Sequence, residues 1–149
     1  MSIQRTFAML KPGVLQRRIM GDVLARFEKK GLNVIGLKIM VISPELAAIH
    51  YAEHKEKSFY QELVSYIVSG PVVAMAIEGD EAIQIVHRLC GPTSVTESSP
   101  GTIRGDYCIH TGNNIVHSSD SADSAARELK NFFQPSEMVS WKDGNSEWF

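Results

Sequence analysis

The chain has 149 residues, enough for one domain with a substantial hydrophobic core, and we expect a single domain over residues 1–149. Hydrophobic residues make up 44% of the chain and charged residues 21%, as in soluble globular proteins, and the net charge of −2 offers no general attraction to nucleic acid. With no apolar run near the roughly 20 residues of a membrane span and no signal-peptide pattern at the N-terminus, we expect a cytoplasmic protein without a membrane or specific nucleic-acid partner.

Apolar patterns in the first half of the chain predict two strands and three helices. A short apolar run predicts the first strand, and the aliphatic run after Gly31 predicts a long second strand. Ser43 and Pro44 are typical of the first positions of a helix. The predicted elements are a strand over residues 6–10, a helix over 19–27, a strand over 32–42, a helix that opens at 43, and a short helix over 59–68.

The second half alternates between β-type runs and helical spacing, with one long irregular segment. Residues 91–106 contain three glycines and two prolines without periodicity, and we expect a long loop there, of the kind that often carries function. The other predicted elements are a strand over 72–77, a helix over 81–89, a short strand that ends over 115–117, and a helix over 122–133. This order predicts an α/β protein of the α+β sandwich type, with a β-α-β-β-α-β core, additional helices and a long loop before the last strand.

His117 stands between a short β-type run and the start of the last predicted helix, among small hydroxyl residues and one acid. An imidazole is a nucleophile near neutral pH, since its unperturbed pKa is about 6.5, and a covalent intermediate divides a difficult transfer into two easier steps. Glu128 follows 11 residues later, roughly three helical turns, and would fix the tautomer of the ring if it reached back; the alternative is a surface glutamate. We interpret His117 as the reactive residue.

Two cations stand where the backbone can approach an anionic ligand. Lys11 precedes Pro12-Gly13 at the end of the first predicted strand, and Arg104 lies between two glycines. A lysine is a compact charge suited to phosphate, and an arginine can bind phosphate through two parallel N–H groups. From spacing alone, a solvated strand-end residue is the better interpretation of Lys11, and an ordinary loop residue fits Arg104 equally well. Thr93 and Asn114 offer further donors, although each is typical of turns.

Aromatic and histidine residues after the second predicted strand allow two interpretations. Tyr51 and Phe59 could hold a nucleobase between their rings, but aromatic residues at helical spacing more often belong to a core. His50 and His54 stand at positions i and i+4 without a third ligand nearby, so we interpret them as surface or core residues. We therefore expect no metal site formed by protein side chains.

These residues together resemble the nucleoside diphosphate kinase family. The run Asn114-x-x-His117-Ser118-Ser119-Asp120-Ser121 is similar to the active-site segment of that family. Three other segments match in the same order: Arg5-Thr6-Phe7 through Lys11-Pro12, Ser69-Gly70-Pro71-Val72-Val73, and Pro100-Gly101-Thr102-Ile103-Arg104-Gly105-Asp106. The resemblance covers almost the whole chain. It implies a ferredoxin-like fold and a ping-pong transfer, in which the γ-phosphate of a nucleoside triphosphate, typically ATP, passes to His117 and then to a nucleoside diphosphate.

The resemblance also implies roles for the other candidates. Asn114 would contact the sugar and phosphates, Phe59 would stack on the base, and Glu128 with Ser119 would orient the reactive histidine. The residues implied for the phosphate side are Lys11, Tyr51, Thr93 and Arg104. Mg²⁺ would be held mainly by the nucleotide phosphates, without ligands from protein side chains. The resemblance implies a closed homo-oligomer, and the segment 93–100 with the tail after Pro135 favours a homohexamer over a homotetramer.

The chain departs from the family pattern at one phosphate-binding position. The family has Arg-x-x-x-Gly-x-Thr here, and counting back from Gly91-Pro92-Thr93 puts His87 in place of the arginine, with Arg88 one residue late. Either Arg88 reaches the nucleotide and joins the nucleotide-binding residues, or His87 substitutes as a weaker phosphate partner. Lys11-Pro12 is also followed by Gly13-Val14 where aspartate is usual. The departure at His87 is the only feature that favours the alternative function, a catalytically impaired nucleotide-binding or scaffold homologue. The presence of all the other expected site residues argues against that alternative: Lys11, Arg104, Asn114, His117 and Glu128.

Overall fold

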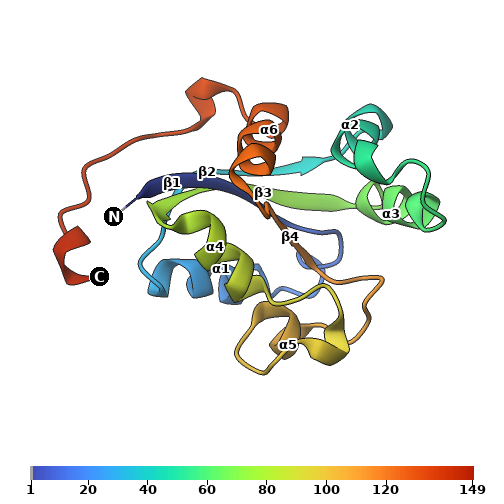
Figure 1. The fold of residues 1–149 in the computed structure, drawn as a ribbon, viewed down its shortest axis with the longest axis horizontal. Coiled ribbons are helices and arrows are strands. Elements are labelled where there is room, and N and C mark those ends of the chain that lie inside the picture. Colours follow the sequence, from blue (N-terminus) through green and yellow to red (C-terminus); the bar gives the residue numbers. More distant parts are fainter. Residues whose placement is uncertain (1) are drawn as a thin grey trace.

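A computed structural model describes residues 2–149, which form a sheet with helices on both faces (Figure 1). The strands are β1 (Ile3–Leu10), β2 (Asn33–Val41), β3 (Pro71–Asp80) and β4 (Val116–Ser118). The α-helices are α1 (Met20–Lys29), α2 (Pro44–His50), α3 (Tyr60–Ile67), α4 (Ala82–Cys90), α5 (Ile103–Tyr107) and α6 (Ala122–Phe132). Short 3-10 turns lie at Ala52–His54, Val95–Glu97, Pro135–Glu137 and Ser146–Trp148. None of the helices formed by residues 2–149 has the length and apolar character needed to cross a membrane.

The sheet is antiparallel, with the order β2-β3-β1-β4, so β1 and β3 are central and β2 and β4 lie at its edges. This order confirms the predicted β-α-β-β-α-β core and the ferredoxin-like fold. Between β1 and β4, Met9 pairs with His117 and Ala8 pairs with Ser118. Because directly paired residues point to the same side of a sheet, His117 lies on the face of Met9 and Ser118 lies on the face of Ala8.

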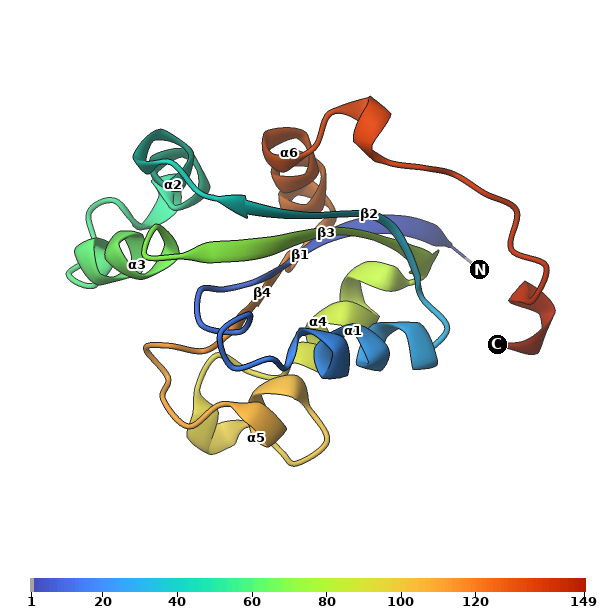
Figure 2. The same ribbon diagram turned by 180° about the vertical axis from the view of Figure 1, so that it is seen from behind.

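The two faces of the sheet carry separate hydrophobic clusters, and alternate residues of β1 belong to one or the other. Ala8 and Leu10 pack with residues of α1 and α4. Phe7 and Met9 pack on the opposite face with residues of α2, α3 and α6. Figures 1 and 2 show these layers from two sides, with α1 and α4 over one face and α6 over the other. The side chain of His117 therefore belongs to the α6 layer.

The predicted strands and helices are present, although their ends shift by a few residues. Ser43 caps α2 as expected, because its Oγ accepts a hydrogen bond from the N–H of Leu46 at 3.1 Å. Ser121 caps α6 by accepting from the N–H of Ser124 at 3.1 Å. Since α6 begins at Ala122, Glu128 lies less than two turns into the helix, and the expectation of roughly three turns was wrong.

The segment 91–106 contains the long loop that the sequence pattern predicted, over residues 91–102, but the loop is shorter and less irregular than expected. The segment also contains the 3-10 turn Val95–Glu97 and the beginning of α5. Thr102 caps α5, since its Oγ1 accepts from the N–H of Gly105 at 3.0 Å. A five-residue helix is too short to show a helical period in its sequence, which explains why the pattern missed it. The short helix carries Arg104 into the protein interior, where only 6% of that residue is exposed.

Candidate active site

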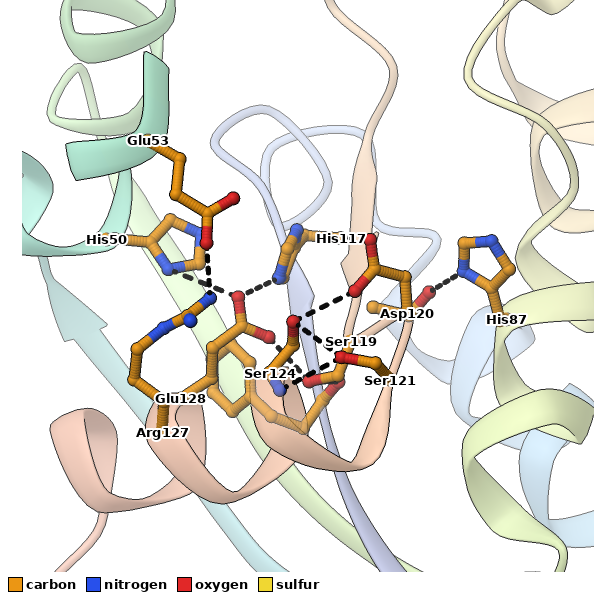
Figure 3. A network of polar contacts seen from close by, with 12 residues as sticks. His50, Glu53, His87, His117, Ser119, Asp120, Ser121, Ser124, Arg127 and Glu128 are labelled. Carbon is orange, nitrogen blue, oxygen red and sulfur yellow. Dashed lines mark hydrogen bonds and ion pairs between the residues drawn. The ribbon is translucent and has the colours of Figure 1, made fainter. Parts of the chain in front are cut away.

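A buried carboxylate holds the His117 ring. Nε2 of His117 lies 2.8 Å from Oε2 of Glu128, and the other carboxylate oxygen accepts a hydrogen bond from the hydroxyl of Ser119. Figure 3 shows the His117 side chain from β4 and the Glu128 side chain from α6 pointing toward each other. Burial would raise the pKa of the Glu128 carboxyl, but the hydrogen bond and charge of His117, together with Ser119, lower it below its usual value. Glu128 is therefore an ionised carboxylate near neutral pH.

This carboxylate fixes which nitrogen of His117 carries the proton. An ionised carboxylate can only accept hydrogen bonds, so Nε2 of His117 must be the donor. The neutral ring then keeps its lone pair on Nδ1. The backbone N–H of Ser119 donates to the carbonyl of Phe7 at 3.0 Å, which holds the Ser119 hydroxyl beside the carboxylate. The result is an oriented imidazole with a free lone pair on Nδ1, on a side chain that is 23% exposed.

His50 also belongs to this group, which the sequence pattern did not indicate. Its Nδ1 lies 3.7 Å from Oε2 of Glu128, and the rings of His50 and His117 meet edge-on with their centroids 4.6 Å apart. The His50 side chain is 1% exposed, and neither ring nitrogen has a hydrogen-bond partner among residues 2–149. Burial, and then the nearby His117, lower the pKa of His50 to about 3, so the ring is neutral. No local signal could have found this role, because only tertiary packing brings the end of α2 to β4.

A second polar group lies just before β4. Nζ of Lys11 donates to Oδ1 of Asn114 at 2.7 Å, and each of these residues is 6% exposed. The ends of β1 and β4 bring them together, since the backbone N–H of Lys11 also donates to the carbonyl of Ile115 at 2.8 Å. Burial, and then the charge of Arg104, lower the pKa of Lys11 from 10.5 to about 8. An anion beside this ammonium would therefore relieve an unfavourable burial of charge.

Arg104 is bonded to the backbone around β4. Its guanidinium donates to the carbonyl oxygens of Gly91, Asn114 and Val116. These acceptors come from two separate segments, so Arg104 ties the end of α4 to the chain immediately before His117. Burial lowers the pKa of Arg104, yet a guanidinium remains charged near neutral pH. The side chain thus links two backbone segments through hydrogen bonds and also places a positive charge in the interior.

A cavity of about 120 Å³ opens beside His117, between α2, the following 3-10 turn and α6. Tyr51 lines this cavity but is only 6% exposed, and its hydroxyl has no partner among residues 2–149. Phe59 is 44% exposed, and its ring centroid lies 5.8 Å from that of His54, which also lines the cavity. The structure does not arrange Tyr51 and Phe59 as two walls of a base slot, because the Tyr51 ring packs in the hydrophobic cluster of the α6 face. Phe59 offers the accessible ring.

Two predicted positions lie outside both polar groups. Thr93 is exposed after α4, and Arg88 is exposed on α4, where it lines a groove with Lys30. His87 of α4 contacts β4, with its Nδ1 3.2 Å from the hydroxyl of Ser118. Successive helical residues point about 100° apart, so His87 and Arg88 do not both face the strand. The geometry places His87, and not Arg88, beside Ser118, the residue after His117.

Comparison with known proteins identifies the family of the chain. Residues 4–138 match the family model described as nucleoside diphosphate kinase. The chain is 53% identical over 149 residues to the nucleoside diphosphate kinase of Treponema pallidum (strain Nichols), with 100% of both chains covered. It is 49% identical over 146 residues to that of Archaeoglobus fulgidus, covering 98% of this chain and 97% of the relative.

A solved structure gives the same result. The halophilic nucleoside diphosphate kinase from Halobacterium salinarum, in complex with CDP, superposes with a TM-score of 0.95 and 46% sequence identity. The match covers 99% of this chain and 98% of that one. The chain therefore belongs to the nucleoside diphosphate kinase family and is a phosphotransferase that acts on nucleotides.

Proposed function

We propose that the chain transfers the γ-phosphate of a nucleoside triphosphate, typically ATP, to Nδ1 of His117 and then to a nucleoside diphosphate. The observation that carries this proposal is the hydrogen bond from Nε2 of His117 to Oε2 of Glu128, with the two atoms 2.8 Å apart. This hydrogen bond uses Nε2 and leaves the lone pair of Nδ1 free to attack. Such a ping-pong exchange would keep nucleoside and deoxynucleoside triphosphate pools in balance.

The first half-reaction needs little from the protein beyond position and charge. The Nδ1 lone pair of His117 attacks the γ-phosphorus, the bond from that phosphorus to the bridging oxygen breaks, and the diphosphate leaves with the electron pair. The ring becomes positive as the new bond forms, and the adjacent Glu128 carboxylate stabilises that charge. In the second half-reaction a terminal oxygen of the acceptor diphosphate attacks the same phosphorus, and Nδ1 leaves as a neutral imidazole nitrogen.

Lys11 and Arg104 supply the positive charge that the phosphates require, with Asn114 holding the lysine. Mg²⁺ completes the neutralisation and enters as part of the nucleotide substrate. Mg²⁺ prefers octahedral coordination by oxygen, whereas the side chains of residues 2–149 that gather closely enough to hold an ion are two histidines and one glutamate, His50, His117 and Glu128. This nitrogen-rich set does not suit Mg²⁺, in keeping with an ion held mainly by nucleotide phosphates.

Phe59 provides the surface for the base. Stacking on one exposed aromatic ring tolerates different bases, which suits an enzyme that exchanges phosphate among nucleotides. The related halobacterial structure contains CDP, a pyrimidine nucleotide. We propose nucleoside triphosphates and diphosphates of both base classes as substrates.

The edge strand β2 supports assembly into a homo-oligomer. Its outer residues Leu37, Ile39 and Val41 are 51%, 61% and 64% exposed, and one side of the strand has no partner strand among residues 2–149. An unpaired edge with apolar side chains is a natural place for a second copy to bind. We propose a closed homohexamer, with a homotetramer as the alternative, working in the cytoplasm, where the free thiols of Cys90 and Cys108 remain reduced.

The direct test is a single-turnover labelling without acceptor. The protein and a His117→Ala variant are incubated with Mg²⁺ and γ-labelled ATP, and the labelled protein is tested for acid lability and for transfer to added GDP. We expect an acid-labile label that requires His117 and moves to GDP. An unlabelled protein that still binds ATP would instead support the alternative of a catalytically impaired homologue.

A further inference from the structure

We propose that a zinc-class divalent ion binds between His50, His117 and Glu128 and thereby stops phosphate transfer. One ligand atom from each of these residues lies within 4.8 Å of the other two. Two imidazole nitrogens and one carboxylate oxygen form a ligand set that zinc uses at sites where a fourth position stays open. The blocking effect rests on the proposed role of His117, whereas the binding itself does not.

His50 is the residue that sets this group apart from an ordinary histidine–carboxylate pair. Its side chain is 1% exposed, and both ring nitrogens are buried without a hydrogen-bond partner among residues 2–149. A buried polar group without a partner is unfavourable, and native structures usually provide one. A metal ion would give one His50 nitrogen the partner that it lacks, and it would replace the hydrogen bond between His117 and Glu128 with bonds from both residues to the ion.

The rearrangement that the ion requires is small. Zinc binds nitrogen and oxygen at about 2.0–2.2 Å, so two ligands at a tetrahedral angle lie roughly 3.4 Å apart. Nδ1 of His50 is already 3.7 Å from Oε2 of Glu128, and the 2.8 Å separation between Nε2 of His117 and that oxygen must lengthen. The side chain of His117 is 23% exposed and borders the cavity, so its ring has room to turn.

The surroundings favour a cation. The cavity beside the three ligands is also lined by Glu53 and Asp120, and by Arg127, whose guanidinium pairs with Glu53 at 3.2 Å. Together with Glu128, the carboxylates outnumber the one guanidinium. Figure 3 shows these acidic side chains around the same opening. The cavity of about 120 Å³ can hold a water molecule as the fourth ligand of the ion.

The consequence for the reaction follows from the lone pairs of imidazole. A neutral ring has one lone pair in its plane, and Glu128 normally keeps it on Nδ1 of His117 by accepting the proton of Nε2. An ion that binds Nε2 takes that nitrogen's electron pair, and the proton moves to Nδ1. The nitrogen that attacks phosphorus is then protonated and has no electron pair to share. Metal binding and phosphate transfer therefore exclude each other.

Metal binding can be measured without nucleotide, using Co²⁺ as the probe. Tetrahedral Co²⁺ gives intense visible absorption bands, and we expect one bound ion per chain. His50→Gln and His117→Gln each remove a different ligand, and each should weaken Co²⁺ binding tenfold or more. His110→Gln, which changes an exposed histidine outside the group, should bind Co²⁺ as the unmodified protein does. Absence of the bands, or an affinity in both ligand variants equal to that of the unmodified protein, would overturn the site.

The inhibitory effect has a separate readout. With Mg²⁺–ATP and GDP in excess, added Zn²⁺ should slow transfer in a saturable manner that a chelator reverses, and the His50→Gln variant should need at least tenfold more Zn²⁺ for the same fractional slowing. Bound Co²⁺ with an undiminished transfer rate would overturn the inhibition. Failure of the proposed function would look different, since the metal-free protein would then acquire no label from γ-labelled ATP.

Discussion

Nε2 of His117 on β4 and Oε2 of Glu128 on α6 lie 2.8 Å apart, and this contact decides which nitrogen of the histidine can react. The pairing arises because the register of β4 against β1 turns His117 toward the α6 layer. The hydroxyl of Ser119 donates a hydrogen bond to the second carboxylate oxygen, and this fixes the orientation of the carboxylate relative to the His117 ring. Three residues from one short stretch of sequence, 117–128, thus form one hydrogen-bonded group.

Changing Glu128→Gln should reduce the rate of phosphate transfer by about 100-fold with a smaller effect on nucleotide KM, because the ring loses both its orientation and its counter-charge. Ser119→Ala removes only the second contact of the carboxylate and should reduce the rate by about tenfold or less. Steady-state kinetics of both variants, with melting temperatures to confirm folding, checks this order. Equal rates in Glu128→Gln and the unmodified protein would show that the contact does not act in catalysis.

The buried Lys11 predicts opposite pH dependences for activity and stability. Its pKa is lowered to about 8, so the ammonium loses its charge above that pH, and kcat/KM for Mg²⁺–ATP should fall as pH rises through about 8. In the unfolded chain the pKa is 10.5, so the folded state binds fewer protons between these values, and this group makes the free energy of unfolding rise with pH there.

The opposite trends of kcat/KM and of the free energy of unfolding distinguish loss of the Lys11 charge from general unfolding at alkaline pH. A kcat/KM that stays constant to about pH 10, well above the pKa of this lysine in the folded protein, would contradict its proposed phosphate role. A Lys11→Gln variant should lose the alkaline fall in kcat/KM and begin from a lower value.

Arg104→Lys should lower the free energy of unfolding by about 2–5 kcal/mol. An ammonium cannot reach all three carbonyl oxygens that the guanidinium now satisfies, and each buried acceptor left unpaired costs about 1–3 kcal/mol. Arg26→Lys is a matched control, since Arg26 also bonds a carbonyl, that of Gly101, but from a part-exposed position, where the change should stay within about 1 kcal/mol. Chemical denaturation at one protein concentration measures the free energy of unfolding of both variants and of the unmodified protein. An equal loss of unfolding free energy in the two variants would contradict the proposed structural role of Arg104.

Phe59→Ala should raise the KM for every nucleotide by a similar factor, because it removes a stacking surface and not a base-specific hydrogen bond. Stacking on an aromatic ring contributes about 1–3 kcal/mol, which corresponds to a rise of roughly 5- to 150-fold. Phe59→Tyr keeps the ring and should leave KM nearly unchanged. A rise confined to purine or pyrimidine nucleotides would contradict recognition by stacking alone.

Much of this fold could be predicted from periodicity, and what could not be predicted depends on tertiary contacts. The last helix shows its period over many residues, the second strand is marked by a long aliphatic run, and Ser43 marks a helix start through its side chain. Helix α5 has five residues and no period, so only the capping residue Thr102 could have indicated it. A local sequence pattern describes one segment and does not show which other segments it contacts.

The site shows the same division. His117 and Glu128 could be proposed from residue type and from resemblance, and the structure brings them together. His50 could not, because its contact with His117 depends on how α2 packs against the end of the sheet. The position of Arg88 shows a further limit: a shift of one residue in a helix turns a side chain by about 100°, which spacing arguments alone do not resolve.

The central claim is that Glu128 keeps the proton on Nε2 of His117 and leaves Nδ1 as the nucleophile. The most direct measurement is NMR of the phosphorylated protein with ¹⁵N-labelled histidine, which identifies the nitrogen bonded to phosphorus from its coupling to ³¹P. We predict a bond between phosphorus and Nδ1 of His117, with Nε2 still protonated. Phosphorus on Nε2, or on any residue other than His117, would contradict the account.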